Sequence, residues 1–211
     1  MISLNNAEIG YPNRRLLHAV NLEFTKGEML ILEGANGSGK TTLAKVLLGN
    51  LKPLKGDFCN HFLRTAYVPQ RSMLDNQYPL TVSDIIADGE LVSLKRFWHK
   101  GSRAAKKEKV ERLLKDTGLS GAGDLPLREA SGGQLQRALI ARALISEPDF
   151  ILLDEPFSNL DKTGRTIMLE IISRLWKESK TTFFLIDHFG YLPFQEAKKY
   201  RIEGGGVVLL E

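Results

Sequence analysis

The 211-residue sequence predicts an α/β fold, in which helices cover a sheet of buried strands. Three observations support this prediction. Short, nearly continuous apolar runs recur along the chain, as in strands that are buried on both faces. Segments with apolar residues at helical spacing lie between these runs. A glycine-rich loop joins one of the runs directly to a helical segment. In such a sheet, ligands bind at the carboxyl ends of the strands.

The first 70 residues are predicted to form mainly strands. The opening stretch "ISLNNAEIGY" is followed by "AVNLEF", in which Val20, Leu22 and Phe24 alternate with polar residues as in a half-buried strand. The segment "EMLILEG", residues 28–34, is almost entirely apolar and predicts a strand covered on both faces. The segment "TAYVPQ", residues 65–70, predicts a further short strand.

The first two predicted helical segments follow the glycine-rich loop and Leu80. After the glycine-rich loop at residues 34–42, Leu43, Val46 and Leu47 fall at helical spacing, and a downstream glycine and proline end this helix. From Leu80 onward the chain contains helix formers and few β-branched runs. We interpret the chain as one domain, residues 1–211, whose core carries a helical insertion. The predicted core comprises residues 1–79 and 124–211, and the predicted helical subdomain comprises about residues 80–123.

The core is predicted to resume after this insertion. A helix begins at "SGGQLQR", and residues 148–156, "PDFILLDEP", form a buried strand that ends in two acids. A helix is expected from about Lys162 to Lys177, followed by a buried strand at residues 181–188. A hairpin around residues 204–206 closes the chain.

The composition is that of a globular protein, with 43% hydrophobic and 26% charged residues. The single cysteine, Cys59, allows no intrachain disulfide and fits a reducing compartment, and we expect it to be a small buried or loop residue. The start of the chain lacks the regions of a signal peptide, and its apolar runs are much shorter than a membrane span. We therefore expect a protein that is soluble by itself.

The net charge of +4 is a mild excess, and no nucleic-acid partner is predicted from it. Much of the excess lies in one basic run from Leu94 to Lys109. This run is either a solvated helix face or a surface turned toward anionic lipid headgroups or an acidic partner.

The loop "GANGSGKT" matches the pattern G-x-x-x-x-G-K-[ST] and lies between an apolar strand and a helix, where a phosphate-binding loop is expected. In such a loop, backbone N–H groups surround phosphate oxygens, Lys40 places its charge at the β- and γ-phosphates, and the Thr41 hydroxyl binds Mg²⁺. We call residues 34–42 the phosphate loop. Its predicted nucleotide-binding residues are Gly34, Asn36, Gly37, Ser38, Gly39, Lys40, Thr41 and Thr42.

A phosphate loop needs an acid near the metal, and the strand "FILLDE" ends in two. Asp154 is predicted to hold Mg²⁺ through its water shell and Glu155 to polarise the attacking water, the alternative being an acid pair that faces solvent. Gln70 either reaches the metal or the water, or is a surface glutamine. His188 either donates to the γ-phosphate or has a structural role.

In their order along nearly the whole chain, these residues resemble the ATP-binding cassette (ABC) family. The matching motifs are the phosphate loop, Gln70, "SGGQ" at Ser131–Gln134, Asp154–Glu155, "SNLD" at Ser158–Asp161, and His188. The resemblance implies a P-loop NTPase of ABC type, with an N-terminal antiparallel β-subdomain and an inserted helical subdomain. It implies hydrolysis of ATP with Mg²⁺, for which Glu155, His188 and Gln70 are the catalytic candidates.

The resemblance also implies binding roles for further residues. The metal candidates are Thr41, Gln70 and Asp154. Tyr11 occupies the place where the family stacks an aromatic ring on adenine, the alternative being an ordinary packed tyrosine.

The resemblance explains why a second glycine-rich helix start, "SGGQ", is present. In the family, two nucleotide domains meet head to tail, and each "SGGQ" covers the ATP in the partner's phosphate loop. Asp161 is expected to cross the same interface. ATP then favours the closed dimer, and a homodimer is the favoured assembly. The residues predicted to complete the partner's site are Ser131, Gly132, Gly133 and Gln134.

Three departures from the family pattern are present. Ala130 stands where a leucine usually precedes the signature serine, and the segment after His188 lacks the family's usual acid. Because the sequence ends soon after its last predicted hairpin, we expect no C-terminal regulatory domain.

The predicted function is that of an ATPase subunit of an ABC transporter. Its expected location is cytoplasmic, peripheral on the inner face of the cell membrane, with transmembrane permease subunits that dock near residues 70–91. The stretch from Ala66 to Ile86 resembles the zinc/manganese-type metal importers. The alternatives are a soluble ABC ATPase in a non-transport process, such as iron–sulfur assembly, and a regulatory nucleotide sensor, which the retained Glu155 disfavours.

Overall fold

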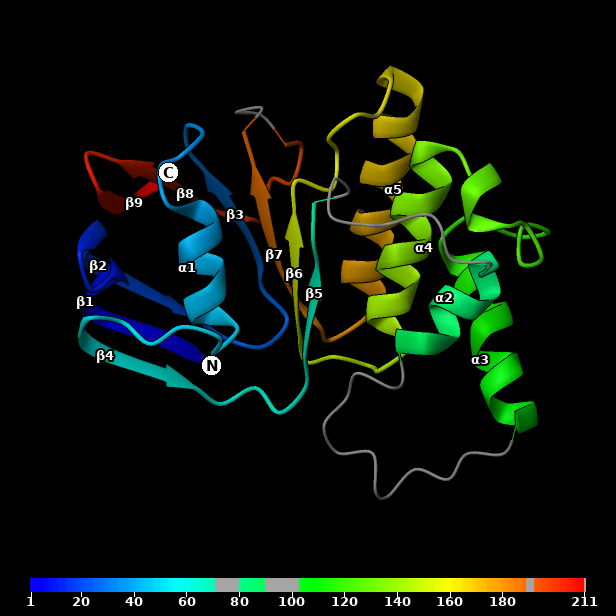
Figure 1. Ribbon diagram of the computed structural model, residues 1–211, viewed down its shortest axis with the longest axis horizontal. Helices are drawn as coiled ribbons and strands as arrows, with labels where there is room; N and C mark the ends of the chain where they lie inside the picture. Colours follow the sequence, from blue (N-terminus) through cyan, green and yellow to red (C-terminus); the bar gives the residue numbers. More distant parts are fainter. Residues whose placement is uncertain (71–79, 90–102, 189–191, 211) are drawn as a thin grey trace.

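The computed structural model describes residues 1–70, 80–89, 103–188 and 192–210. Its central element is a six-stranded sheet with the order β5-β6-β7-β3-β8-β9, in which β9 is antiparallel and the other strands are parallel. Figure 1 shows that the parallel strands end along one edge of the sheet, the upper edge in that view. The strands are β3 (Met29–Glu33), β5 (Thr65–Val68), β6 (Phe150–Asp154), β7 (Thr182–Asp187), β8 (Lys198–Glu203) and β9 (Gly206–Leu210).

A second, antiparallel sheet has the order β2-β1-β4. Its strands are β1 (Ile2–Tyr11), β2 (Arg14–Phe24) and β4 (Lys55–Asn60). Strand β2 begins five residues before the predicted "AVNLEF". Ala19 has a φ of 50°, and the β1–β2 register shifts near it. This irregularity interrupts the alternation of apolar and polar residues, so the sequence pattern covers only the second part of the strand. Strand β4 is not among the predicted strands. Its sequence, "KGDFCN", lacks an apolar pattern, and its pairing with β1 defines it.

Helix α1 (Lys40–Leu47) lies between the two sheets (Figure 1). Its apolar residues Leu43, Val46 and Leu47 are fully buried, and they join a core that includes β1, β2 and one face of the central sheet. Gly49, with a φ of 76°, follows the helix in the left-handed conformation that commonly ends helices. The predicted helix after the phosphate loop is therefore confirmed.

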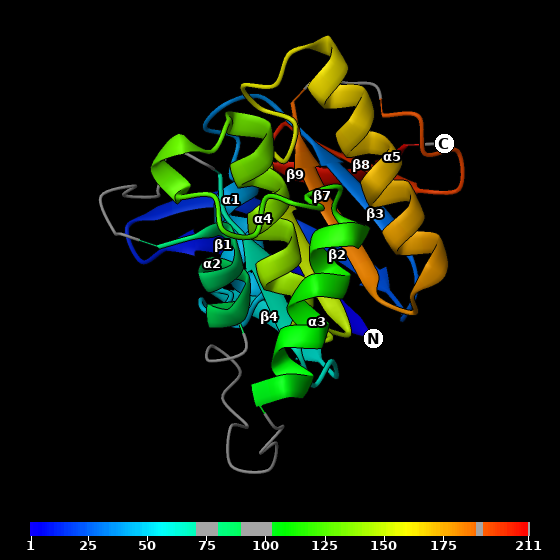
Figure 2. The ribbon, with the colours of Figure 1, turned by 90° about the vertical axis from the view of Figure 1, so that its right-hand side faces the viewer.

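The other face of the central sheet is covered by helices that share a second core. They are α2 (Val82–Asp88), α3 (Arg103–Asp116), α4 (Gly132–Leu144) and α5 (Lys162–Glu178). Helix α4, which follows the predicted insertion in the sequence, packs against α2 and α3, and Figure 2 shows these three helices as a group beside α5. Together with the N-terminal antiparallel sheet, this arrangement confirms the predicted fold class.

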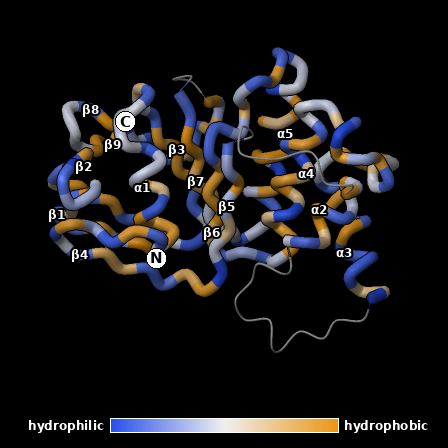
Figure 3. Tube along the Cα trace, viewed as in Figure 1, coloured by the Kyte–Doolittle hydropathy of each residue, from blue (hydrophilic) through white to orange (hydrophobic). Residues whose placement is uncertain are grey.

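Hydrophobic residues concentrate in the central strands and on the inner sides of the helices, as Figure 3 shows. Both faces of β3, β6 and β7 are buried, as their continuous apolar runs predict. Among the described residues, no helix combines the length and the apolar character that a membrane crossing requires.

Candidate active site

The phosphate loop connects β3 to α1 and depends on glycine at several positions. Gly37 and Gly39 have φ values of 78° and 108°, in the left-handed region that side chains disfavour. A Cβ atom on Gly34 would lie 2.8 Å from the Ser38 hydroxyl oxygen and 3.3 Å from the Ile202 Cβ atom. Glycine at these three positions therefore lets the loop turn tightly at the carboxyl end of β3.

The Lys40 side chain is folded beneath this loop. Its Nζ atom donates to the carbonyl oxygens of Gly34 (2.7 Å) and Ala35 (3.0 Å), and the residue is buried. The Ser38 Oγ atom is also buried and has no hydrogen-bond partner within the described protein. A buried cation and an unpartnered hydroxyl beside a helix start fit a phosphate group, which accepts hydrogen bonds from both.

Asp154 ends β6 near the phosphate loop and is almost completely buried. Its Oδ2 atom accepts a hydrogen bond of 3.1 Å from the Tyr67 hydroxyl on β5. Burial raises the pKa of Asp154, and the charge of Glu155 acts in the same direction, whereas the Tyr67 hydrogen bond and the charge of Lys40 oppose the rise. The carboxylate oxygen of Asp154 and the hydroxyl of Thr41 are donors that suit Mg²⁺.

Glu155 follows Asp154 in an unusual backbone conformation, with a φ of 50°. Its backbone N–H donates to the carbonyl of Ile186 on β7 (2.9 Å), which fixes this turn to the neighbouring strand end. Its carboxylate accepts a hydrogen bond of 2.7 Å from the Gln70 amide, and the His188 Nδ1 atom lies 3.7 Å from the same oxygen. The ends of β5, β6 and β7 thus bring Gln70, Glu155 and His188 together.

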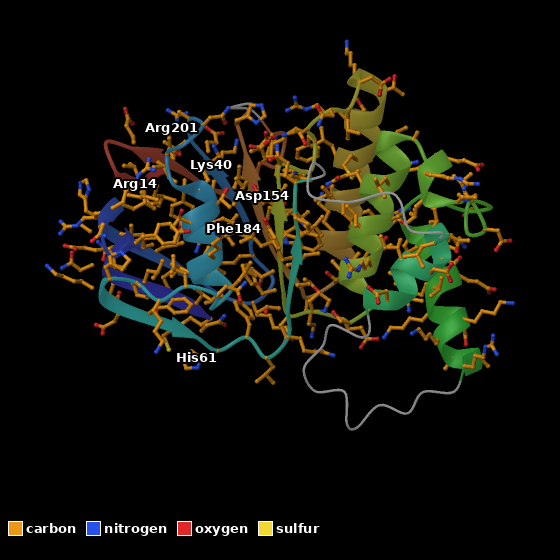
Figure 4. The ribbon with its side chains drawn as sticks, viewed as in Figure 1. Arg14, Lys40, His61, Asp154, Phe184 and Arg201 are labelled. Carbon is orange, nitrogen blue, oxygen red and sulfur yellow. The ribbon has the colours of Figure 1, made fainter. Side chains whose placement is uncertain are left out.

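A hollow of about 450 Å³ lies between the phosphate loop and the ends of β7 and β8. Its lining residues are Glu33, Gly34, Ala35, Asn36, His188, Arg201 and Ile202. Figure 4 shows Lys40, Asp154 and Arg201 along the same upper part of the molecule, toward which the parallel strands point. A second hollow, of about 520 Å³, lies between α5 and Pro193–Phe194, away from these groups.

The remaining predicted binding residues lie apart from this cluster. Tyr11 ends β1 as an exposed side chain, and its hydroxyl accepts a hydrogen bond of 3.4 Å from Lys45 on α1. Ser131 caps the start of α4 in a reciprocal capping box with Gln134. Asp161 caps α5 by accepting from the Gly164 N–H at 2.9 Å. Since α1 and α4 pack on opposite faces of the central sheet, a single chain keeps Ser131 away from its own phosphate loop.

Two contacts at this site were beyond the motif-based predictions. Tyr67 is three positions before Gln70 in the strand "TAYVPQ", but only the pairing of β5 with β6 places its hydroxyl on Asp154. Arg201, in the closing hairpin, forms a 3.1 Å ion pair with the buried Glu33. The sequence signal that could have indicated this ion pair is Glu33 itself, an acid directly before the phosphate loop.

A phosphate loop between a strand and a helix, with two acids and an amide at neighbouring strand ends, defines a P-loop ATPase. The chain belongs to the ABC transporter family, whose model matches residues 17–158. It is an ATP-binding and ATP-hydrolysing subunit of a transporter complex. The family resemblance and the ATPase activity predicted from the sequence are thereby confirmed.

Known proteins show the extent of this similarity. Over 197 residues the chain is 31% identical to the "Probable metal transport system ATP-binding protein" of Thermotoga maritima, covering 93% of this chain and 78% of that protein. An inward-facing ABC transporter assigned to the metal-chelate type superposes with a TM-score of 0.86 and 27% identity, covering 100% of this chain and 82% of that one. The structure of cbiO1 from Clostridium perfringens, part of the ABC transporter complex cbiONQ, superposes with a TM-score of 0.84 and 23% identity. This match covers 99% of this chain and 86% of that one, and it shows a likeness in fold.

Proposed function

We propose that this protein hydrolyses Mg²⁺–ATP at the cytoplasmic face of the cell membrane and thereby drives transport of a metal ion. The observation that carries the enzymatic part is the 2.7 Å hydrogen bond between Gln70 and Glu155, which holds a carboxylate at the strand ends next to the phosphate loop. The metal cargo is supported by the names of two relatives, one a metal transport system protein and one a metal-chelate type transporter. The stretch from Ala66 to Ile86 resembles zinc/manganese-type importers, and its residues 71–79 lie outside the described part.

Substrate binding is assigned to the phosphate loop. Lys40 and the backbone N–H groups bind the β- and γ-phosphates, and Tyr11 stacks on the adenine. Thr41, Asp154 and Gln70 are the residues that would hold Mg²⁺, which when bound neutralises phosphate charge. The phosphate-facing residues of the loop are Gly34, Asn36, Gly37, Ser38, Gly39 and Thr42.

The hydrolytic step is assigned to three residues around Glu155. The Glu155 carboxylate orients the attacking water and accepts its proton. Gln70 holds that carboxylate in place before the substrate arrives, and His188 donates a hydrogen bond toward the γ-phosphate. The 2.7 Å hydrogen bond supports the assignment of Gln70, and the role of His188 toward the γ-phosphate rests on the family resemblance.

Complete ATP sites require a dimer in this proposal, with a second copy of the chain as the favoured partner. Ser131, Gly132, Gly133 and Gln134 of one copy would close over the phosphate loop of the other, and Asp161 would cross the same interface. Two features support the dimer. The start of α4 exposes the helix N-terminus that binds anions well, and a single chain separates it from the phosphate loop.

Permease docking is assigned to the part of the helical insertion near residues 70–91. Within the range 70–91, the structure describes residue 70 and residues 80–89. There α2 begins at a capping box formed by Thr81 and Asp84, and Leu80 is exposed beside it. The basic run from Leu94 to Lys109 lies partly outside the described residues, and Lys109 forms a 2.8 Å ion pair with Glu147.

The transport assignment is tested by metal uptake in the source organism. A strain that lacks this gene should take up less of one transition metal, measured over a panel that includes zinc and manganese, and the wild-type gene should restore it. The Glu155→Gln variant should not restore uptake, although the protein is present. Detergent extraction of the tagged wild-type chain should recover a polytopic membrane protein. Normal uptake of every metal, with only non-membrane partners recovered, would favour the non-transport alternative.

The Tyr67→Phe variant is expected to need about three- to tenfold more Mg²⁺ for half-maximal ATP hydrolysis. Burial and the adjacent Asp154 raise the pKa of Tyr67, so its hydroxyl stays protonated and donates to Asp154. Without this donor the pKa of Asp154 rises further, and a smaller fraction of the carboxylate is charged at any given pH. The deficit should therefore widen as pH falls and narrow as pH rises.

Titration of Mn²⁺ binding to the ATP-loaded protein provides a second measurement, independent of turnover. Tyr200→Phe is the control, because it removes the hydroxyl of a tyrosine on β8, which β3 and β7 separate from Asp154 on β6. An unchanged Mg²⁺ requirement at every pH would show that Tyr67 does not assist Asp154.

A further inference from the structure

Charged residues at the ends of β3, β7 and β8 form a network outside the motifs described above. Glu33, the last residue of β3, is buried, and its Oε2 atom lies 3.1 Å from the Arg201 Nη2 atom on β8. On the other side of β3, Asp187 of β7 is in register with Glu33 and is also buried. Residues in register on neighbouring parallel strands point to the same face of the sheet, so the two carboxylates lie side by side.

Cations lie at both ends of this carboxylate pair. Arg201 is next to Glu33, and the Arg165 Nη2 atom of α5 is 4.0 Å from the Asp187 Oδ2 atom. Two adjacent buried carboxylates repel each other, and removing one cation leaves a negative charge uncompensated in a poorly solvated place. The network therefore constrains how β3, β7 and β8 end relative to one another.

The positions of these carboxylates link the network to the active site. Glu33 is bonded directly to Gly34, the first residue of the phosphate loop, and Asp187 is bonded directly to His188. The His188 backbone N–H also donates to the Asp187 Oδ1 atom at 2.7 Å. Arg201 itself lines the hollow that Asn36 and His188 share. A shift of either carboxylate would thus move a segment that is proposed to contact the terminal phosphate.

We propose that Arg201 is a positioning residue of the ATPase site. By holding Glu33 beside Asp187, Arg201 fixes the spacing between the phosphate loop and His188. The inference rests on the proposed function, since it assigns to these two segments the binding and hydrolysis of ATP. Arg201 acts through Glu33, so its effect falls on the geometry required for hydrolysis more than on the affinity for nucleotide.

The decisive measurement separates turnover from binding in Arg201→Gln. We expect kcat to fall about tenfold, because small displacements of reacting groups are costly, while the Kd for Mg²⁺–ATP stays within about threefold of the wild-type value. Arg201→Lys, which keeps the charge but loses the planar fork, should have an intermediate kcat. Adding Glu33→Gln to Arg201→Gln removes the uncompensated charge and should recover part of the lost kcat.

Arg64→Gln is the matched control, because Arg64 is as exposed as Arg201 (46% and 47% of the side chain) and also faces acidic partners. Arg64 precedes β5 at the opposite end of the parallel strands, so the kcat of Arg64→Gln should equal that of the wild type. Thermal unfolding of all variants would show whether stability alone explains the losses.

Several results would overturn the proposal. One is a wild-type kcat in folded Arg201→Gln, and another is a loss in the single variant that Glu33→Gln does not relieve. Equal losses of kcat in Arg201→Gln and Arg64→Gln would reveal a general structural role. If Arg201→Gln does not fold, Arg201→Lys and the double variant provide the test. A wild-type kcat in Arg201→Lys would then overturn the proposal, as would a double variant with less kcat than Arg201→Lys and no gain from Glu33→Gln. Failure of the proposed function is distinguishable, because the wild type itself would then neither bind nor hydrolyse ATP.

Discussion

Substituting Glu155 by glutamine is expected to reduce ATP hydrolysis by about 10²–10⁴-fold while leaving ATP binding in place. The amide has nearly the same shape as the carboxylate but cannot accept the proton of the attacking water. The backbone bond from residue 155 to Ile186 does not involve the side chain, so the left-handed turn should persist. Steady-state phosphate release measures the loss, and a fluorescent ATP analogue measures the binding that remains.

The same variant tests the shared-site dimer. With hydrolysis blocked, ATP should hold two copies together, because only the closed dimer satisfies the phosphates from both sides. Gel filtration with ATP should show a dimer, and without ATP a monomer. Glu170→Gln, on the exposed side of α5, is the control and should retain full turnover. A Glu155→Gln protein that binds ATP yet stays monomeric would count strongly against the proposed dimer.

The elements of the central sheet were accessible from the sequence because burial leaves a direct pattern. The buried strands β3, β6 and β7 appear as continuous apolar runs, and α1 appears as Leu43, Val46 and Leu47 at helical spacing. Strand β4 left no such pattern. Its first three residues are exposed and its last three are half-buried, so no alternation marks it, and its place depends on pairing with β1, a contact of high sequence separation.

The same distinction divides the candidate site. The phosphate loop was predictable because its conformation depends on glycines and Lys40 that lie within nine consecutive residues, 34–42. The hydrogen bond from Tyr67 to Asp154 and the ion pair from Arg201 to Glu33 join residues separated by 87 and 168 positions. Such contacts follow from strand order and register, which the residue pattern of a single strand does not determine.

The motif at Ser131 has two interpretations, as a helix cap and as part of a partner's ATP site. The spacing Ser-x-x-Gln is a local helix-start signal, and the structure contains both of its hydrogen bonds, at 2.8 and 3.3 Å. The cap orients the start of α4 whether or not a second copy is present. The proposed role of Ser131 in the ATP site of a partner rests on the family resemblance and not on the cap.

Replacing Lys40 by alanine is expected to weaken ATP binding by about 10- to 100-fold, the equivalent of losing one hydrogen bond to a charged group of about 1.5–3 kcal/mol. The Nζ atom of Lys40 donates to the carbonyl oxygens of Gly34 and Ala35, and it supplies the buried positive charge nearest to where phosphate would bind. The variant therefore loses both a phosphate contact and a support of the loop. Isothermal titration with a non-hydrolysable ATP analogue measures the affinity directly.

Two comparisons separate these contributions in the Lys40→Ala protein. Lys52→Ala removes an exposed lysine just beyond α1 and should bind ATP as the wild type does. Thermal unfolding without nucleotide reports the loss of loop support, whereas the additional stabilisation by ATP reports the loss of the phosphate contact. If Lys40→Ala binds ATP with wild-type affinity, residues 34–42 are not the nucleotide site. In that event the cluster at the strand ends, formed by Glu155, Gln70 and His188, would have another role.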